Sequence, residues 1–337
     1  MSRRLVWTSL VLLIAALAAW LIVNRLRPTE NRVRLQLSGP VSAQFAGYYA
    51  AKERGFYSDE GLDVRILTGG RSVSPLETVV GRRADIGVGT VPALLSARDR
   101  GLPLVNIAQI FQYSGLRLVA LKASGIKGAA DLRGRKVGVW FGGSEVPLLA
   151  TLEKYRIDRS KQVTLVSQPL NMTFLLNRLV DAAMALTYRE YSELRKAGVD
   201  TNGLTVIDFN REGTALLEDG LVAREDWITN PRRLELAGRV LKASLRGWEF
   251  CRDRPEECVA ILLKHSPNLD RNDQTLMMQE VNRLIWGPPA PKAALGFMDP
   301  DAFERTAELL RRFGAITKPA ATTNAYTHKA WTVATEQ

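Results

Sequence analysis

The chain has 337 residues, enough for two domains, and its 46% hydrophobic and 24% charged content is that of a globular protein, not a disordered one. The net charge is +11, but acids are mixed with the bases and no basic run is interleaved with aromatics, so nucleic-acid binding is not expected. The cysteines are Cys251 and Cys258, and the histidines are His265 and His328. They fall in no metal-ligand spacing, so no metal is expected. No other cofactor is expected either.

Residues 1–30 are predicted to be a targeting or anchoring segment. Arg3 and Arg4 precede an uncharged run, Leu5–Val23, which as a helix would span about 28 Å, close to the thickness of a bilayer core. Ala16–Ala18 is a candidate signal-peptidase site, but apolar residues continue past it. More arginines follow the run than precede it, so charge does not settle the orientation. We predict that this segment remains as an uncleaved anchor in the cytoplasmic membrane, with the rest of the chain on the periplasmic side. The alternative is a cleaved signal peptide.

From residue 32 the pattern alternates between strands and helices. The predicted strands cover 33–37, 63–67, 84–89, 104–109 and 116–121. The predicted helices cover 44–54 and 75–80, and another begins at Pro92. This alternation predicts a mostly parallel sheet. We assign residues 31–121 to the first part of a first lobe.

A second series of units follows, and we assign residues 122–222 to a second lobe. Its predicted strands cover 136–140, 163–166, 182–186 and 204–209, and the helices after it cover 231–253, 255–265, 270–286 and 300–313. No linker rich in Pro, Gly or Ser occurs near residue 230, so residues 223–337 are predicted to return to the first lobe. Such lobes form a hinged clamp around a ligand, with crossovers expected near Val119–Lys122 and Leu221–Ala223.

The segment Gly142–Gly143 indicates a binding site, because it lies between a strand that ends at Trp140 and a helix that begins at Val146. Such a turn presents free backbone N–H groups, and open α/β sheets bind ligands at the carboxyl ends of their strands. Trp140 offers an aromatic face and Glu145 a carboxylate, which suits a flat, amine-bearing molecule. The alternative is an ordinary turn in which Trp140 is core and Glu145 complements the helix dipole.

Several longer segments resemble known proteins. Gln44–Tyr57, followed by Glu60–Val64, resembles the opening of extracytoplasmic substrate-binding proteins of ABC importers. The branch is the one that includes binders of sulfonate, nitrate, taurine and thiamine pyrimidine precursors. Gly81–Val88 is similar to a further segment of this family, while Val139–Glu145 and Leu186–Tyr191 look most like the thiamine-precursor members. The resemblance implies the type II periplasmic-binding-protein fold.

In those members an aminopyrimidine is held between aromatic rings and fixed by carboxylates, which fits the physics of ring stacking and amine–carboxylate hydrogen bonds. The ligand-binding residues expected from the resemblance and the turn are Gln44, Tyr48, Trp140, Gly142, Gly143, Ser144, Glu145, Tyr188 and Glu190. The alternative for Tyr188 is packing under the next helix, and for Glu190 a solvated helix face. No catalytic residue is expected.

The resemblance thus implies a solute-binding protein that delivers a formylaminopyrimidine-like compound to ABC permease and ATPase subunits. The alternatives are a binder of sulfonate, taurine, nitrate or a riboflavin-like compound, and a membrane-tethered sensor. A sulfonate site would need N–H donors and an arginine, whereas Glu145 and Glu190 would repel an anion. A related eukaryotic and fungal branch synthesises the pyrimidine with a histidine, a lysine and a cysteine-rich motif. Because Gly69–Pro75 offers no histidine and no cysteine cluster exists, an enzyme is not expected.

Cys251 and Cys258 lie on either side of Pro255. In one unbroken helix they would be about 10 Å apart, too far for a disulfide. A bend at Pro255 would bring them together, and an oxidising compartment would allow the bond. Cys251 also continues the apolar stripe of its helix, so the sequence leaves both a disulfide and free thiols open.

Overall fold

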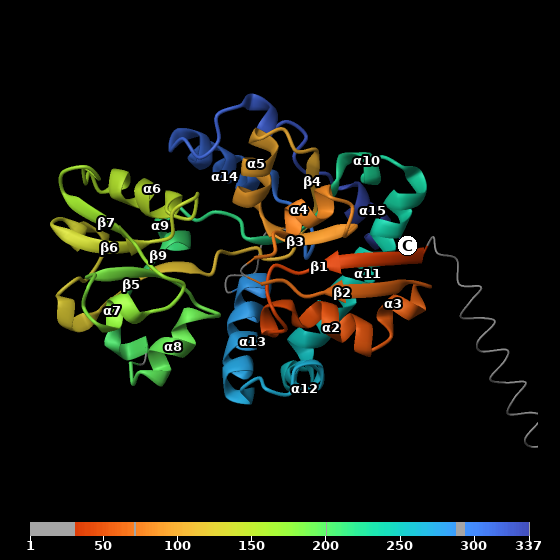
Figure 1. The fold of residues 1–337 in the computed structure, drawn as a ribbon, viewed down its shortest axis with the longest axis horizontal. Helices are drawn as coiled ribbons and strands as arrows, with labels where there is room; N and C mark the ends of the chain where they lie inside the picture. The colour runs from red at the N-terminus through yellow and green to blue at the C-terminus, as the bar shows by residue number, and fades with distance from the viewer. Residues whose placement is uncertain (1–30, 71, 200, 288–293, 337) are drawn as a thin grey trace, which may run out of the picture.

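The protein has two α/β lobes, side by side, each built on one five-stranded sheet (Figure 1). The structure, a computed structural model, describes residues 31–70, 72–199, 201–287 and 294–336. The predicted two-lobed arrangement with a helical return is therefore observed. The predicted anchor, residues 5–23, lies outside the described residues. In the part of the chain that is described, no helix is long and apolar enough to cross a membrane.

The first sheet has the strand order β2-β1-β3-β10-β4. Its strands are β1 (Arg32–Gln36), β2 (Asp63–Leu67), β3 (Ile86–Thr90), β4 (Leu104–Gln109) and β10 (Asp219–Arg224). β1 pairs in parallel with β2 and β3, while β10 lies antiparallel between β3 and β4. The sheet is thus mixed, with one reversed strand, and not purely parallel.

The second sheet repeats this plan in the order β7-β6-β8-β5-β9. Its strands are β5 (Leu116–Leu121), β6 (Arg135–Val139), β7 (Val163–Ser167), β8 (Ala182–Leu186) and β9 (Leu204–Asp208). β6 pairs in parallel with β7 and β8, while β5 lies antiparallel between β8 and β9. In each sheet the reversed strand is the one that the chain enters directly after crossing between the lobes.

Both crossovers lie earlier in the chain than the sequence predicted. β5 belongs to the second sheet, so the first crossover is residues 110–115 and not Val119–Lys122. Leu221–Ala223 lies inside β10 of the first sheet, so the second crossover ends at Glu218. A buried strand has the same apolar pattern in either sheet, and its pattern alone cannot tell which neighbours it will pair with.

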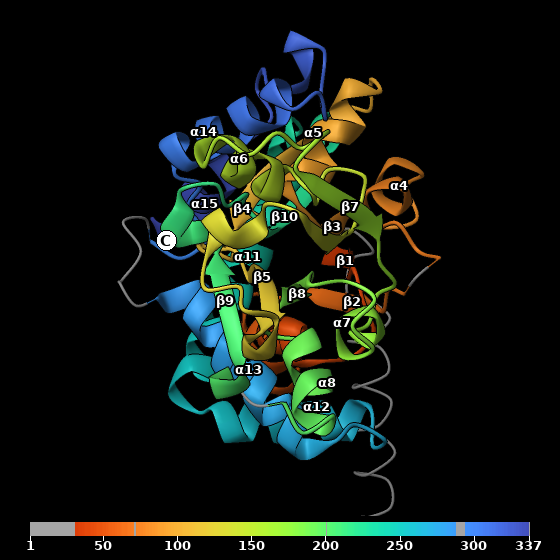
Figure 2. The ribbon, with the colours of Figure 1, turned by 90° about the vertical axis from the view of Figure 1, so that its left-hand side faces the viewer.

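Helices cover both faces of each sheet. They are α2 (Ala46–Glu53), α3 (Phe56–Asp59), α4 (Pro75–Val80), α5 (Val91–Asp99), α6 (Val146–Lys154), α7 (Thr173–Leu176), α8 (Glu190–Lys196), α9 (Phe209–Glu212), α10 (Glu225–Ile228), α11 (Pro231–Asp253), α12 (Pro255–His265), α13 (Arg271–Trp286), α14 (Pro300–Arg312) and α15 (Lys329–Thr335). In the second lobe, α6 lies on one side of the sheet and α7 and α8 on the other (Figure 2). Alternating buried residues of β5 divide accordingly, with Leu118 in the core under α6 and Val119 in the core under α7 and α8.

The long helix α11 fastens the helical return to the first lobe. Its glycine Gly247 lies against α2 so closely that a Cβ there would stand 2.0 Å from the carbonyl oxygen of Gly47. A Cβ at Gly47 would in turn meet the Trp248 ring at 2.2 Å. Trp248 is fully buried and meets Tyr48 edge to face, with ring centroids 5.5 Å apart. The two glycines therefore allow a large aromatic residue to join the return helix to the first lobe.

Cys251 and Cys258 form a disulfide that joins α11 to α12. Their Cα atoms are 5.4 Å apart, well within the range for a disulfide, because the helix ends at Asp253 and restarts at Pro255. The backbone of Arg254, between the two helices, leaves the helical region with φ −136° and ψ 60°. The bend at the proline, one of the two possibilities in the sequence, is thus the one the structure adopts.

Removing this disulfide should lower the stability of the first lobe. Closing so short a loop stabilises a fold by about 2–3 kcal/mol in the chain-entropy account. We expect the double variant Cys251→Ala, Cys258→Ala to unfold at lower denaturant concentration than the oxidised wild type. Reductant should shift the wild-type midpoint and leave that of the variant unchanged. Two free thiols in the denatured, unreduced protein would contradict the disulfide.

Candidate ligand-binding cleft

Two adjoining cavities lie between the lobes. The second-lobe cavity has a volume of about 250 Å³, and its lining includes Trp140, Ser144 and Glu218. The first-lobe cavity has a volume of about 490 Å³, and its lining includes Ser38, Gln44, Ser74, Asp219 and Gln274. Thr90, Tyr188 and Arg189 line both. Most of these residues follow the carboxyl ends of β1, β3, β6 and β8, the edge at which open α/β sheets bind ligands.

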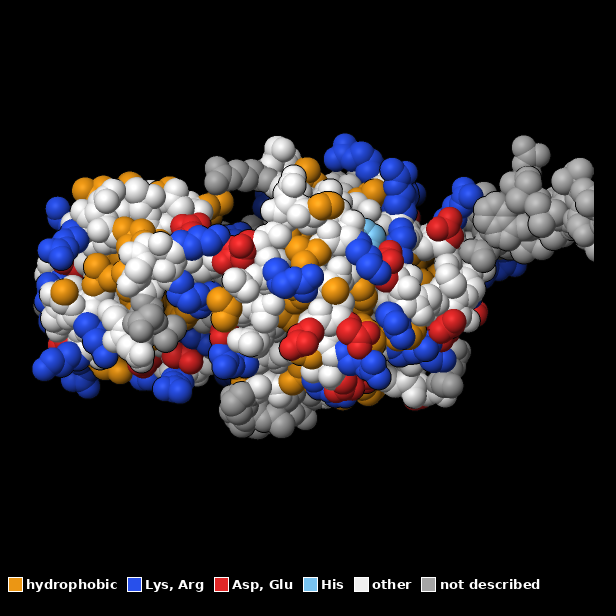
Figure 3. Space-filling model, turned by 90° about the horizontal axis from the view of Figure 1, so that it is seen from below, with side chains coloured by type: hydrophobic (Ala, Val, Ile, Leu, Met, Phe, Trp, Pro, Cys, Tyr) orange, Lys and Arg blue, Asp and Glu red, His pale blue; other side chains and the backbone are white. Residues whose placement is uncertain are grey.

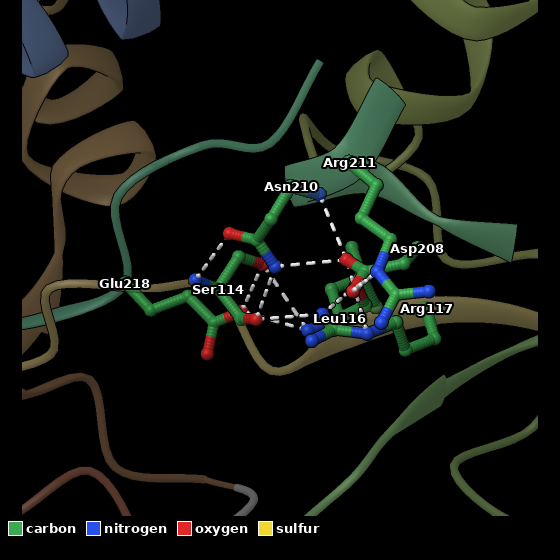
Figure 4. A network of polar contacts seen from close by, with 7 residues as sticks. All are labelled: Ser114, Leu116, Arg117, Asp208, Asn210, Arg211 and Glu218. Atoms are coloured by element: carbon green, nitrogen blue, oxygen red, sulfur yellow. Dashed lines mark hydrogen bonds and ion pairs between the residues drawn. The ribbon is translucent and has the colours of Figure 1, made fainter. Parts of the chain in front are cut away.

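The two crossover segments are hydrogen-bonded to each other (Figure 4), and Ser114 and Glu218 of this junction line the second-lobe cavity. The side chain of Asn210 accepts a hydrogen bond from the Ser114 backbone N–H at 3.0 Å and donates one to the Ser114 carbonyl at 2.9 Å. The Ser114 hydroxyl donates to Glu218 at 2.6 Å, and the backbone N–H of Leu116 donates to the same carboxylate at 3.0 Å. Arg117 adds an ion pair with Asp208 at 3.2 Å.

Tyr188 connects this junction to the cavities. Its hydroxyl donates to Glu218 at 3.4 Å, and its ring meets Phe111 edge to face at 5.8 Å. A Cβ on Gly115 would stand 2.7 Å from the Tyr188 ring, so only glycine lets the first crossover pass so close. Burial raises the pKa of both the Tyr188 hydroxyl and the Glu218 carboxyl. The tyrosine ring is thus a rigid wall shared by both cavities.

Asp219 is the buried acid of the first-lobe cavity. Gln44 donates a hydrogen bond to its Oδ2 at 2.8 Å, and among the described residues its other oxygen has no hydrogen-bond partner. Burial raises the pKa of Asp219 to about 7, the Gln44 hydrogen bond lowers it, the charge of Glu218 raises it, and that of Arg189 lowers it. Near neutral pH this acid can therefore donate a hydrogen bond to a ligand when it is protonated, or accept one when it is ionised.

The predicted glycine turn reaches the second-lobe cavity, but Gly142 and the carboxylate of Glu145 are not among the described residues that line it. Trp140, Gly143 and Ser144 line the second-lobe cavity, and Trp140 Nε1 donates to the Pro169 carbonyl at 3.2 Å, which fixes the ring. Gly142 and Gly143 have φ values of 104° and 109°, where other residues are strained. Glu145 is absent from the described lining of both cavities, and it accepts the Gly143 N–H at 2.7 Å. Its observed contact holds the turn.

Glu190 is likewise not at the cavity surface, contrary to its predicted role. Its side chain is fully buried, and it accepts a hydrogen bond from the Leu186 N–H at 2.9 Å. Its other oxygen pairs with Arg189 Nε at 2.7 Å. The sequence singled out the glutamate, but the neighbouring arginine is the residue that lines the cleft.

Tyr48 also differs from its prediction. It is 1% exposed, packs against Trp248, and lines neither cavity, because it lies on the face of α2 that meets α11. Sequence reasoning missed Arg189, Glu218, Asp219 and Thr90. The signal for the two acids was their place just before the apolar run Leu221–Ala223, at the start of a buried strand.

Comparison with known proteins identifies the family. A model of the family described as NMT1/THI5 like matches residues 42–258. The chain belongs to this family. The resemblance found in the sequence is therefore confirmed.

Relatives of this NMT1/THI5-like chain include both binding proteins and enzymes. The riboflavin-binding protein RibY of Chloroflexus aurantiacus is 27% identical over 90% of this chain and 87% of its own. The formylaminopyrimidine-binding protein of Halalkalibacterium halodurans is 25% identical over 82% of this chain and 84% of its own. A 4-amino-5-hydroxymethyl-2-methylpyrimidine phosphate synthase of Legionella pneumophila is 26% identical over 71% of this chain and 75% of its own.

A solved structure gives the fold. The periplasmic aliphatic sulphonate-binding protein SsuA of Escherichia coli superposes with a TM-score of 0.68. The match covers 88% of this chain and 91% of that one, at 16% identity. The predicted periplasmic-binding-protein fold is thus confirmed for the described lobes of this NMT1/THI5-like chain.

The raised pKa of Asp219 predicts how stability depends on pH. Between about pH 4 and pH 7 the folded protein holds a proton on Asp219 that the unfolded chain releases. The contribution of this proton to the free energy of unfolding is complete below about pH 4 and is lost as the pH rises through about 7. Asp219→Asn keeps the shape without the charge. We expect the difference in melting temperature between the variant and wild type to shift in favour of the variant as the pH rises from 5 to 8.

The exposed Asp301 provides the control for this comparison, since Asp301→Asn changes the same side-chain type at the surface. Its difference from wild type should not grow between the two pH values. An Asp219→Asn difference that is equal at pH 5 and pH 8 would contradict the assignment.

Proposed function

We propose that the protein is an extracytoplasmic solute-binding protein that captures a flat, amine-bearing heterocycle between its lobes and delivers it to an ABC permease. The favoured ligand class is a thiamine-precursor aminopyrimidine. The observation that carries the proposal is the conjunction of Trp140 and Tyr188 with the buried acid Asp219 in one cleft. Aromatic faces stack on a ring, while a carboxyl group exchanges hydrogen bonds with an amine and the adjacent ring nitrogen.

Asp219 takes the role that the sequence gave to Glu145 and Glu190. An aminopyrimidine presents a donor and an acceptor side by side, and a carboxyl with a pKa near 7 matches that pair in either protonation state of the complex. Glu218 is less available, because its oxygens already accept hydrogen bonds from Ser114, Leu116 and Tyr188. The formylaminopyrimidine-binding relative supports this choice of ligand.

A riboflavin-like ligand is the second candidate. The two cavities, of about 250 and 490 Å³, adjoin at Thr90, Tyr188 and Arg189, and together they offer more room than a single pyrimidine ring fills. The relative named as a riboflavin-binding protein, which aligns over most of this chain, supports the same reading. Sulfonate, taurine and nitrate remain as further test ligands, since Glu145 and Glu190, which were expected to repel an anion, are not among the described residues that line the cavities.

A binding role is favoured over pyrimidine synthesis by the placement of the histidines. His265 pairs with Glu53 at 2.9 Å, and His328 bonds the Met298 carbonyl at 2.8 Å. Neither histidine lines the cleft cavities, and no lysine is among the described residues that do. A membrane-tethered sensor is the other alternative, and permease and ATPase genes beside this gene would favour import.

Trp140→Ala should weaken ligand binding. Loss of an aromatic contact, which is worth about 0.5–1.5 kcal/mol beyond burial, together with the lost burial should reduce aminopyrimidine affinity about tenfold or more, at about 1.4 kcal/mol per factor of ten. Phe141→Ala is the matched control, since Phe141 is adjacent, 55% exposed and outside both cavity linings. Calorimetric titrations with aminopyrimidine, riboflavin and taurine measure these affinities. Binding of taurine alone would contradict the heterocycle proposal.

The compartment is tested separately. The disulfide is consistent with an oxidising compartment. Surface charges of both signs are interspersed on the face of the protein that Figure 3 shows. We propose that residues 5–23 hold the protein on the periplasmic face of the cytoplasmic membrane. Fractionation should find it in the membrane fraction and extractable only by detergent. A soluble periplasmic form that starts near Ala19 would contradict the anchor.

A further inference from the structure

Arg189 is held in place by a buried carboxylate. Glu190 is fully buried and fixed to the backbone N–H of Leu186 at 2.9 Å. Its second oxygen accepts from Arg189 Nε at 2.7 Å. The pair therefore sets the position of the guanidinium at its inner nitrogen.

The outer end of the same guanidinium is available to a ligand. Among the described residues, the two terminal nitrogens of Arg189 have no hydrogen-bond or ion-pair partner. The side chain is 45% exposed and lines both cavities. Two terminal nitrogens in one plane form a fork that matches two oxygens of one acidic group.

Hydroxyl groups line the same first-lobe cavity as this arginine. Ser74 and Thr90 each accept a hydrogen bond from a backbone N–H, of Glu77 and Ala93 respectively, at the start of α4 and α5. A hydroxyl that accepts in this way keeps its own proton free to donate. Of the described residues that line this cavity, Asp219 alone is acidic. The lining thus offers donors around one fixed positive charge.

We propose that Arg189, with the hydroxyls of Ser74 and Thr90, forms a subsite for a phosphate ester on the bound heterocycle. This inference rests on the proposed function, because the ring must occupy the same cleft. The natural ligand is then a phosphorylated heterocycle and not the neutral ring. Arg189 binds the phosphate oxygens, and Glu190 is its positioning residue.

The test compares 4-amino-5-hydroxymethyl-2-methylpyrimidine with its phosphate ester by calorimetric titration. Wild-type protein should bind the ester at least tenfold more tightly, and added salt should reduce that preference. Arg189→Gln should bind both compounds equally, and Arg189→Lys should keep only part of the preference. Arg195→Gln, in the helix α8 that directly follows Arg189 but outside both cavity linings, is the matched control and should behave as wild type.

The outcomes separate this inference from the proposed function. If wild type binds the neutral ring but prefers it to the ester, or if Arg189→Gln and Arg189→Lys both keep the full preference, the phosphate subsite is wrong and the heterocycle proposal stands. If neither compound binds, the aminopyrimidine proposal fails and the subsite fails with it. Riboflavin and its phosphate ester repeat the comparison for the second candidate ligand.

Discussion

The buried carboxylate of Glu218 joins the two segments that connect the lobes, and the cleft is arranged around it. It receives hydrogen bonds from the Ser114 hydroxyl, the Leu116 backbone and the Tyr188 hydroxyl. Removing one partner of a buried carboxylate leaves an uncompensated polar group, so these contacts depend on one another. Because Tyr188 also forms the wall of both cavities, the shape of the binding site and the junction between lobes are one physical unit.

Other polar contacts also connect elements of the two lobes. Asp273 of α13 accepts from Ser192 of α8 at 2.6 Å and also pairs with Lys196. Arg312 of α14 pairs with Glu153 of α6 at 2.8 Å. These exposed or half-exposed pairs contribute little each. The buried hydrogen bonds at Glu218 are therefore the stronger of the polar contacts between the two lobes.

Local structure followed from the sequence, and long-range pairing did not. The apolar spacing along α11 and the alternation in β1 and β2 are local patterns, and each predicted its element correctly. The sheet to which β5 or β10 belongs depends on which strands lie beside it, and the residues within Leu221–Ala223 do not determine those neighbours. The same limit applied to side chains. Trp140 and Tyr188 follow strands and line the cavity, whereas Glu190 turns back to the Leu186 N–H and Tyr48 faces Trp248.

The placement of charge in the cleft restricts what it can hold. Arg189 carries a permanent charge fixed by Glu190, while Asp219 has a pKa of about 7 and is neutral or ionised with little cost near that pH. In the proposed complex, a ligand that fills only the ring position would leave the terminal nitrogens of Arg189 without a ligand partner. Groups desolvated without a partner cost free energy that the rest of the complex must offset, which makes such a site reject the incomplete ligand. On the proposed function, the selectivity of this cleft depends as much on Arg189, which was not predicted as a ligand-binding residue, as on the predicted rings of Trp140 and Tyr188.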